Sequence, residues 1–200
     1  MKKMVCMLLV LLNILSLFGC ASTEESGRAT AATTTAATTE EPKTGFVEVM
    51  REGETDQIPV VYVNGTVGSY TIATDPAYFT FSSRETVDMF AYEGWPGEQA
   101  VYYAISAYSG GYDPDTFIGN SLKQFEGLYG SHRTEATTVG DYPATVICFD
   151  GYRDAPEYCR HVYLVNCGSA RYLIEAEFTF EMYEGLYAIM GALFDTFTVK

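Results

Sequence analysis

Residues 21–45 contain almost none of the side chains from which a hydrophobic core is built. They are mainly Ala, Thr, Ser, Glu and Gly, and no large apolar residue lies between Cys20 and Phe46. Such a segment cannot bury enough surface to offset the entropy lost on ordering. The sequence therefore predicts a disordered Ala/Thr-rich linker over residues 20–45. It confines folding to residues 46–200, about 155 positions, the size of one domain with a substantial core.

The first nineteen residues have the pattern of a secretory signal peptide. Lys2 and Lys3 precede an apolar run that ends in Gly19, and this run is shorter than the ~20 residues of a membrane-spanning helix. The sequence Leu17–Phe18–Gly19–Cys20 resembles the lipobox of bacterial lipoproteins. The resemblance implies cleavage between Gly19 and Cys20, a diacylglyceryl group on Cys20 Sγ, and attachment to the outer face of a bacterial cell membrane. The alternative is a plain signal peptide with an incidental cysteine.

The charge of the chain narrows the choice of partners. Its formal net charge is −14 and its pI is about 4.4. Nucleic acids and anionic lipid headgroups attract basic clusters, so neither is an expected partner of the domain itself. The remaining contact with the membrane is the lipid on Cys20. An acidic surface suits a cationic ligand, although solubility alone also explains it.

Short β-branched and aromatic runs separated by turn residues predict a series of strands. Phe46–Arg51 and Ile58–Val63 flank a turn and predict an N-terminal hairpin at residues 46–63, an extension of the core domain. Short connections predict antiparallel pairing of the later strands. These further strands are expected at Ser69–Ala73, Tyr78–Ser82, Val87–Tyr92, Ala100–Tyr108, Arg133–Val139, Ala144–Phe149, Tyr158–Val165 and Arg171–Glu177.

Two helices are expected among these strands. Asp113 is a suitable N-cap, Pro114 suits the first helical position, and Gly130 ends the pattern. The apolar stripe of this helix comprises Ile118, Leu122, Phe125 and Tyr129. A closing helix begins after Thr179, and its stripe comprises Tyr183, Leu186, Tyr187, Met190, Leu193, Phe194 and Phe197. The expected fold class is α+β, an antiparallel sheet flanked by helices.

This order of elements resembles the Mog1/PsbP-like fold. Three stretches carry the resemblance: Gly140–Ala144, Arg171–Ala176 and Leu193–Phe197. It covers about residues 65–200 and implies an α/β/α sandwich with a binding or assembly role. The matching stretches contain no catalytic residues, so the resemblance assigns none to this chain.

No motif in the sequence indicates a catalytic or metal site. His132 and His161 are not spaced as metal ligands, and no Gly-x-Ser-x-Gly motif is present. Asp113 and Asp115 are explained by helix capping better than by calcium binding. We therefore expect no metal ion, no cofactor and no catalytic residue.

Three cysteines remain in the folded domain. If the strands around Cys148 and Cys159 form a hairpin with its loop at residues 151–156, the two thiols lie nearly opposite and can form a disulfide. Cys167 is then left free, an odd count for an exported protein. Free thiols throughout are the alternative.

The expected function is that of a non-catalytic binding or scaffolding module of the bacterial envelope. Trp95, in a Gly–Pro loop, forms an exposed aromatic patch for a glycan or a protein partner, or else folds back on the core. The competing functions are an envelope hydrolase with an unrecognised site and a receptor for a small ligand or sugar. A deep pocket with shifted pKa values favours an enzyme, whereas a shallow aromatic patch favours binding.

Overall fold

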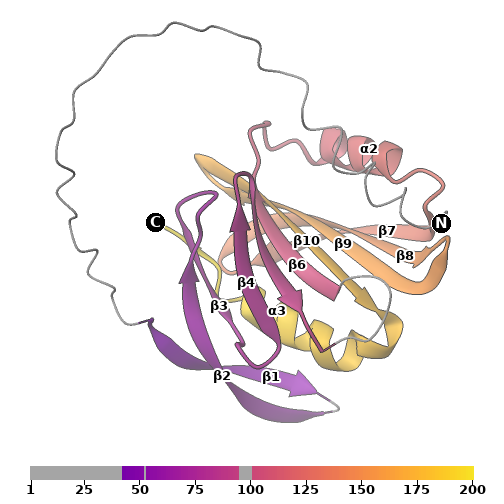
Figure 1. Cartoon of the computed structure of the whole chain (residues 1–200). Coiled ribbons are helices and arrows are strands. Elements are labelled where there is room, and N and C mark those ends of the chain that lie inside the picture. The colour runs from indigo at the N-terminus through magenta and orange to yellow at the C-terminus, as the bar shows by residue number, and fades with distance from the viewer. Residues whose placement is uncertain (1–41, 52, 95–100) are drawn as a thin grey trace, which may run out of the picture. The chain divides into compact units, whose positions relative to one another are not determined.

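Strands form most of the described part of the chain, which comprises residues 42–51, 53–94 and 101–200 of the computed structural model (Figure 1). They build two antiparallel sheets. The larger has the order β4 (Phe79–Arg84), β5 (Val87–Tyr92), β6 (Val101–Ala107), β10 (Ala170–Thr179), β9 (Ala155–Cys167), β8 (Tyr142–Tyr152) and β7 (Tyr129–Val139). The smaller has the order β1 (Thr44–Arg51), β2 (Glu54–Asn64), β3 (Tyr70–Thr74) and β11 (Thr198–Val199).

The helical segments are shorter than the sequence pattern predicts. Helix α2 (Pro114–Gln124) begins as expected, with the Asp113 carboxylate accepting from Thr116, but it ends before Phe125. Tyr129 therefore belongs to β7 and not to the helix. The C-terminal segment is a 3₁₀ turn (Phe180–Met182), a π-helical turn (Tyr183–Tyr187) and α3 (Ala188–Phe194). Among the described residues, no helix is long and apolar enough to cross a membrane.

The predicted α+β fold, a sheet flanked by helices as in a Mog1/PsbP-like α/β/α sandwich, is wrong. The strands form close to where they were predicted, but they divide between two sheets. The hairpin of β1 and β2 does not stand apart, because β2 pairs with β3 and β3 pairs with the C-terminal β11. This second sheet packs over the face of the larger sheet where a layer of helices was expected, with the short α3 beside it (Figure 1).

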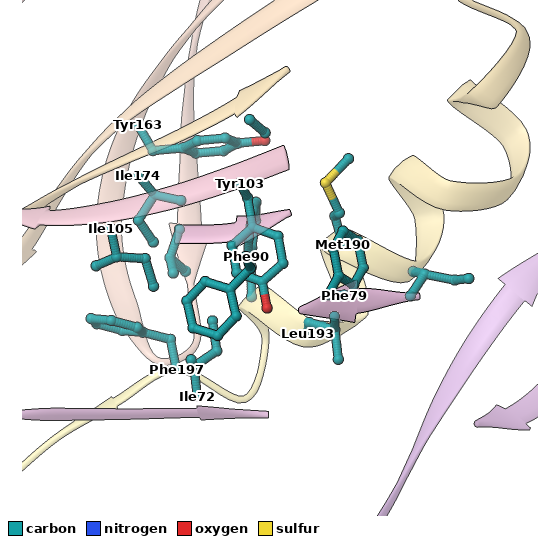
Figure 2. Packing of buried hydrophobic residues seen from close by; sticks show 14 of the residues in the cluster. Ile72, Phe79, Phe90, Tyr103, Ile105, Tyr163, Ile174, Met190, Leu193 and Phe197 are labelled. Carbon is teal, nitrogen blue, oxygen red and sulfur yellow. The ribbon is translucent and has the colours of Figure 1, made fainter. Parts of the chain in front are cut away.

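The main core lies between the two sheets and includes one face of α3. The Phe90 ring stacks on the Tyr103 ring at 4.4 Å, and Phe194 of α3 meets the edge of Tyr103 at 5.3 Å. Figure 2 shows side chains of both sheets and of α3 meeting in this core. Alternate residues of each central strand point into it, as the period of two along a strand requires. These aromatic contacts fix α3 against the larger sheet.

A second, smaller core forms on the opposite face of the larger sheet. Phe117 and Phe125 of the α2 segment pack there against buried apolar side chains of β8 and β9. The sheet residues involved are Ile147, Phe149, Val162 and Leu164. Among the described residues, the larger sheet is thus covered on one face by the smaller sheet and α3, and on part of the other face by α2 and the segments next to it, which contribute Tyr108, Tyr112 and Leu128.

A buried carboxylate joins the two sheets. Asp88 of β5 is fully buried, and its Oδ2 accepts from the Thr66 backbone N–H at 2.8 Å and from the Tyr70 hydroxyl at 2.6 Å. Its Oδ1 accepts from the Thr66 hydroxyl at 2.5 Å. Burial alone would raise the pKa of Asp88, but the hydrogen bonds from Thr66 and Tyr70 outweigh it and hold the pKa below its ordinary value. The carboxylate is therefore charged at neutral pH and locks the β2–β3 connection onto β5.

The turn between β7 and β8 should tolerate no side chain at Gly140. Gly140 has a φ of +54°, and a Cβ there would lie 2.3 Å from the Phe197 carbonyl oxygen. Gly168 is the control: it has a φ of +78° with open space around it, so a Cβ there costs only the strain of the backbone conformation. We expect Gly168→Ala to lower the free energy of unfolding by about 1 kcal/mol and Gly140→Ala by roughly 3 kcal/mol or more. Denaturant unfolding measures both, and equal losses would contradict the predicted steric contact with Phe197.

Candidate functional site

A hollow of about 420 Å³ opens where the end of α2 meets the start of β7. It forms there because α2 ends at Gln124. Gly127, with a φ of +70°, then turns the chain back into the sheet. The lining residues come from the helix end, from β7 and from β8. They are Leu122, Lys123, Phe125, Glu126, Gly127, Tyr129, Ser131, His132 and Phe149.

Three aromatic rings form the inner wall of this hollow. Phe149 lies 5.0 Å from Phe125 and 5.3 Å from Tyr129, measured between ring centroids. Phe125 and Phe149 are buried, and Tyr129 is half-buried. Burial raises the pKa of Tyr129, so its hydroxyl keeps its proton at neutral pH. The wall is therefore a fixed apolar surface with a neutral hydroxyl group on one ring.

The rim of the hollow is polar and carries both signs of charge. Lys123 lies in the last turn of α2 and Glu126 just after it, and Ser131 and His132 lie in β7. All four residues line the hollow and are exposed. A wall of aromatic rings with a few polar groups at its edge is typical of sites for small ligands that have an apolar face and several hydrogen-bonding groups. Sugar rings and peptide side chains have this chemistry.

An ion-pair cluster supports the aromatic wall from the sheet. The Arg160 guanidinium lies 5.1 Å from the centroid of the Phe125 ring, a cation–π distance. Arg160 also donates to Glu177, to Glu175 at 3.4 Å and to the Tyr102 hydroxyl at 3.2 Å. Burial lowers the pKa of Arg160, but the nearby Tyr102, followed by Glu177, Tyr129 and Glu175, more than offsets this and keeps the pKa raised. The charge of Arg160 is thus paired with Glu175 and Glu177 inside the protein, and its guanidinium holds the Phe125 ring in place.

A second group of polar side chains lies in the main core and was not predicted from the sequence. Cys148 of β8 lies directly opposite His161 of β9. His161 Nδ1 is 2.9 Å from the Tyr187 hydroxyl, which is 2.9 Å from the Tyr163 hydroxyl. The π-helical turn ends at Tyr187 and brings this hydroxyl onto the sheet. Only the pairing register of β8 and β9 could have revealed this arrangement.

The Cys148–His161 pair is held in the uncharged state. Burial, with a smaller effect of Arg133, lowers the pKa of His161 to about 4. Burial raises the pKa of Cys148 to about 11. A catalytic cysteine requires a thiolate, which a nearby imidazolium stabilises. Both shifts oppose that charge state, so we interpret this group as a part of the core.

Of the two alternatives for the cysteines, the structure has free thiols at Cys148, Cys159 and Cys167 and no disulfide between Cys148 and Cys159. Next to the turn, Tyr152 pairs with Ala155, a register that would place Cys148 opposite Cys159. A bulge between Asp150 and Tyr152 then shifts the pairing by two residues. The two cysteines become diagonal neighbours, for which the Cα separation of about 7–8 Å exceeds the usual disulfide range.

The other residues considered in the sequence analysis fall into two groups. His132 lies on the rim of the hollow, and Asp113 caps α2 as expected. Gly19, Cys20 and Trp95 lie outside the described residues, so the lipid attachment and the aromatic patch stay predictions. Within residues 42–51, 53–94 and 101–200, no three His, Cys, Asp or Glu side chains are grouped as they would be to hold a metal ion.

Two comparisons of the sequence with known proteins give no match. No protein-family model fits the sequence, and no curated protein is similar to it at a significant level. The function of the chain has therefore to be inferred from its own residues and their geometry.

The buried histidine should make stability depend on pH. The ordinary pKa of His161 is 6.5 and its pKa in the fold is about 4, so the unfolded chain takes up the proton first as the pH falls. Above pH 6.5 the titration of His161 does not reduce the free energy of unfolding. Between pH 6.5 and 4 it lowers this free energy by about 3 kcal/mol. We expect His161→Gln to flatten this part of the curve of unfolding free energy against pH.

His132→Gln is the matched control, because His132 is exposed. It should keep the slope of the parent protein between pH 6.5 and 4, measured by denaturant unfolding at each pH. A parent curve that is flat over this interval, or a His161→Gln curve as steep as the parent, would mean that His161 is accessible to protons in the fold.

Proposed function

We propose that this protein is a lipid-anchored, non-catalytic binding module on the outer face of a bacterial cell membrane, with the hollow between α2 and β7 as its ligand site. The hollow carries the binding part of this proposal. It combines a fixed aromatic wall with an exposed polar rim, and it is open to solvent on one side. Such a site suits reversible recognition of an envelope component.

The N-terminal sequence supports the location. Cys20 follows an apolar segment at the position that a lipobox requires, and a polar linker separates it from the first strand. Two or more acyl chains give long-lived membrane attachment, because each buried methylene contributes about 0.8 kcal/mol. A linker of this length spans on the order of 25–30 Å on average. The ligand is therefore to be sought close to the membrane surface.

The interior polar groups do not favour the competing enzyme function. The one cysteine–histidine pair of the described residues lies in the main core, with both groups uncharged at neutral pH. The charge of Arg160 is paired with Glu175 and Glu177, and its guanidinium faces the Phe125 ring. By contrast, the side chains around the hollow are positioned for contact with a ligand, and the binding proposal rests on them.

Loss of Cys20 should release the protein from the membrane. Cys20→Ala removes the proposed acceptor of the lipid, whereas Cys6→Ala changes only the segment that is cleaved off. In bacteria labelled with palmitate, we expect label in the parent and in Cys6→Ala, and none in Cys20→Ala. Equal amounts of the parent and of Cys20→Ala in the medium, or an unmodified Cys20 in the mass spectrum of the membrane fraction, would refute the anchor.

Filling the hollow should weaken ligand binding. Soluble peptidoglycan fragments are the probe, because they offer both sugar rings and peptide side chains. Ser131→Trp places a bulky ring at the rim, and we expect it to weaken the affinity at least tenfold. Calorimetric titration measures this change, and the thermal unfolding of each variant shows that it remains folded.

Thr198→Trp is the matched control for this substitution. Thr198 is exposed and lines a separate hollow of about 660 Å³ beside β11. It should bind the fragments as the parent does. Unchanged binding by Ser131→Trp would place the site elsewhere, and no binding by the parent would exclude peptidoglycan as the ligand.

A further inference from the structure

The outer edge of β7 is open and unusually long. β7 is the last strand of the larger sheet, and among the described residues it pairs with β8 alone (Figure 1). It has 11 residues, contains no proline, and is exposed continuously from Gly130 to Ala136. Such an edge presents a row of N–H and C=O groups that another strand can pair with. Its side chains indicate which strand that is.

The sequence Arg133–Thr134–Glu135 is complementary to itself. When two copies of β7 pair antiparallel about an axis through Thr134, Arg133 of each copy lies opposite the partner's Glu135. Thr134 then lies opposite the partner's Thr134, and Tyr129 lies opposite the partner's Val139. We propose that two copies of this protein associate through β7 in this register, joining their larger sheets into one continuous sheet.

The charges select this register over its neighbours. Arg133 and Glu135 are two residues apart and share one face of the strand, so each can reach the residue directly opposite. An axis through Arg133 would place two arginines opposite each other, and an axis through Glu135 would place two glutamates together. Like charges directly opposite are destabilising, whereas the axis through Thr134 forms two ion pairs.

The surroundings of Arg133 are compatible with this pairing. Its Nε donates to Glu135 of its own strand at 2.9 Å, and its Nη1 lies 3.2 Å from Asp150 of β8. Arg133 and Glu135 are both exposed, so their polar atoms remain accessible from the open edge. The second copy would also place the partner's Ala136 opposite His132, beside the rim of the hollow.

Cysteine cross-linking in membranes of cells that express the whole chain tests the register. Thr134→Cys places two thiols opposite each other across the axis, and we expect a dimer of covalently linked chains on oxidation. Ala136→Cys is the matched control, since it lies on the same exposed face of the strand. Its thiol would be about 14 Å from the partner's along the strand direction. The parent chain gives the background from the native cysteines.

Charge reversal then tests the ion pairs. In the Thr134→Cys background, Arg133→Glu and Glu135→Arg should each reduce the cross-linked fraction at least tenfold, because each creates like-charge pairs. The two variants are then given different tags and expressed together. In a dimer of one variant with the other, each glutamate lies opposite an arginine of the partner chain. We expect a cross-linked heterodimer at the level of the Thr134→Cys protein, which also shows that both variants are folded.

The opposite results would overturn the proposal. Cross-linking of Ala136→Cys as efficient as that of Thr134→Cys would indicate random collision or another register. Dimers unaffected by either charge reversal would exclude the Arg133–Glu135 pairs. A Thr134→Cys protein that stays monomeric on oxidation would show that two copies do not pair through β7.

Discussion

The arrangement of the two sheets depends on the hydrogen bonds that Asp88 accepts. A buried carboxylate is costly unless donors replace the water it loses, and here the donors come from the other sheet and the connection before it. Thr66 supplies a backbone N–H and a hydroxyl, and Tyr70 supplies a second hydroxyl. Because these donors meet only when β3 lies against β5, the carboxylate favours one placement of the smaller sheet. Gly65 makes this possible, since a Cβ there would lie 2.1 Å from the Tyr70 ring.

The C-terminal segment completes the same contact from the other side. The Phe197 ring stacks on Tyr70 at 5.3 Å and meets the edge of Tyr172 of the larger sheet at 5.4 Å. The Thr196 hydroxyl accepts from the Ala73 backbone N–H and donates to the Leu193 carbonyl. It therefore ends α3 and starts the pairing of β11 with β3. The closing helix is short because the residues after it are needed in the smaller sheet.

Local patterns in the sequence predicted the elements well and their assembly poorly. The strands lie close to the predicted ranges, and Asp113 caps α2 as expected, because alternation and capping are properties of neighbouring residues. The division into two sheets falls between β3 and β4, and the smaller sheet is completed by β11, whose Thr198–Val199 pairing with β3 joins residues far apart in the chain. Phe197 was assigned to the apolar stripe of the closing helix, although α3 ends at Phe194. A buried aromatic side chain fits a helix and an extended segment equally well, so the sequence pattern did not distinguish them.

The candidate site shows the same limit on a finer scale. The bulge at Asp150–Tyr152, where Gly151 has a φ of +70°, moves Cys148 away from Cys159 and places it opposite His161. His132 was visible as a histidine after a helix, but its position beside Phe149 required the pairing of β7 with β8. Features that depend on register are therefore the ones that the sequence alone could not supply.

The two faces of the larger sheet are consequently suited to different tasks. The face toward the smaller sheet holds Asp88 and His161, whose polar atoms bond to tyrosine and threonine groups inside the fold. Binding a ligand there would require breaking the contacts that join the sheets. The α2 face and the β7 edge are different, because in the described part of the chain the short α2 and its flanking segments cover only part of that face, and β7 is exposed along most of its length. A ligand or a second copy can be accommodated there at little cost to the core, so recognition is expected on the side of the sheet that contributes least to holding it together.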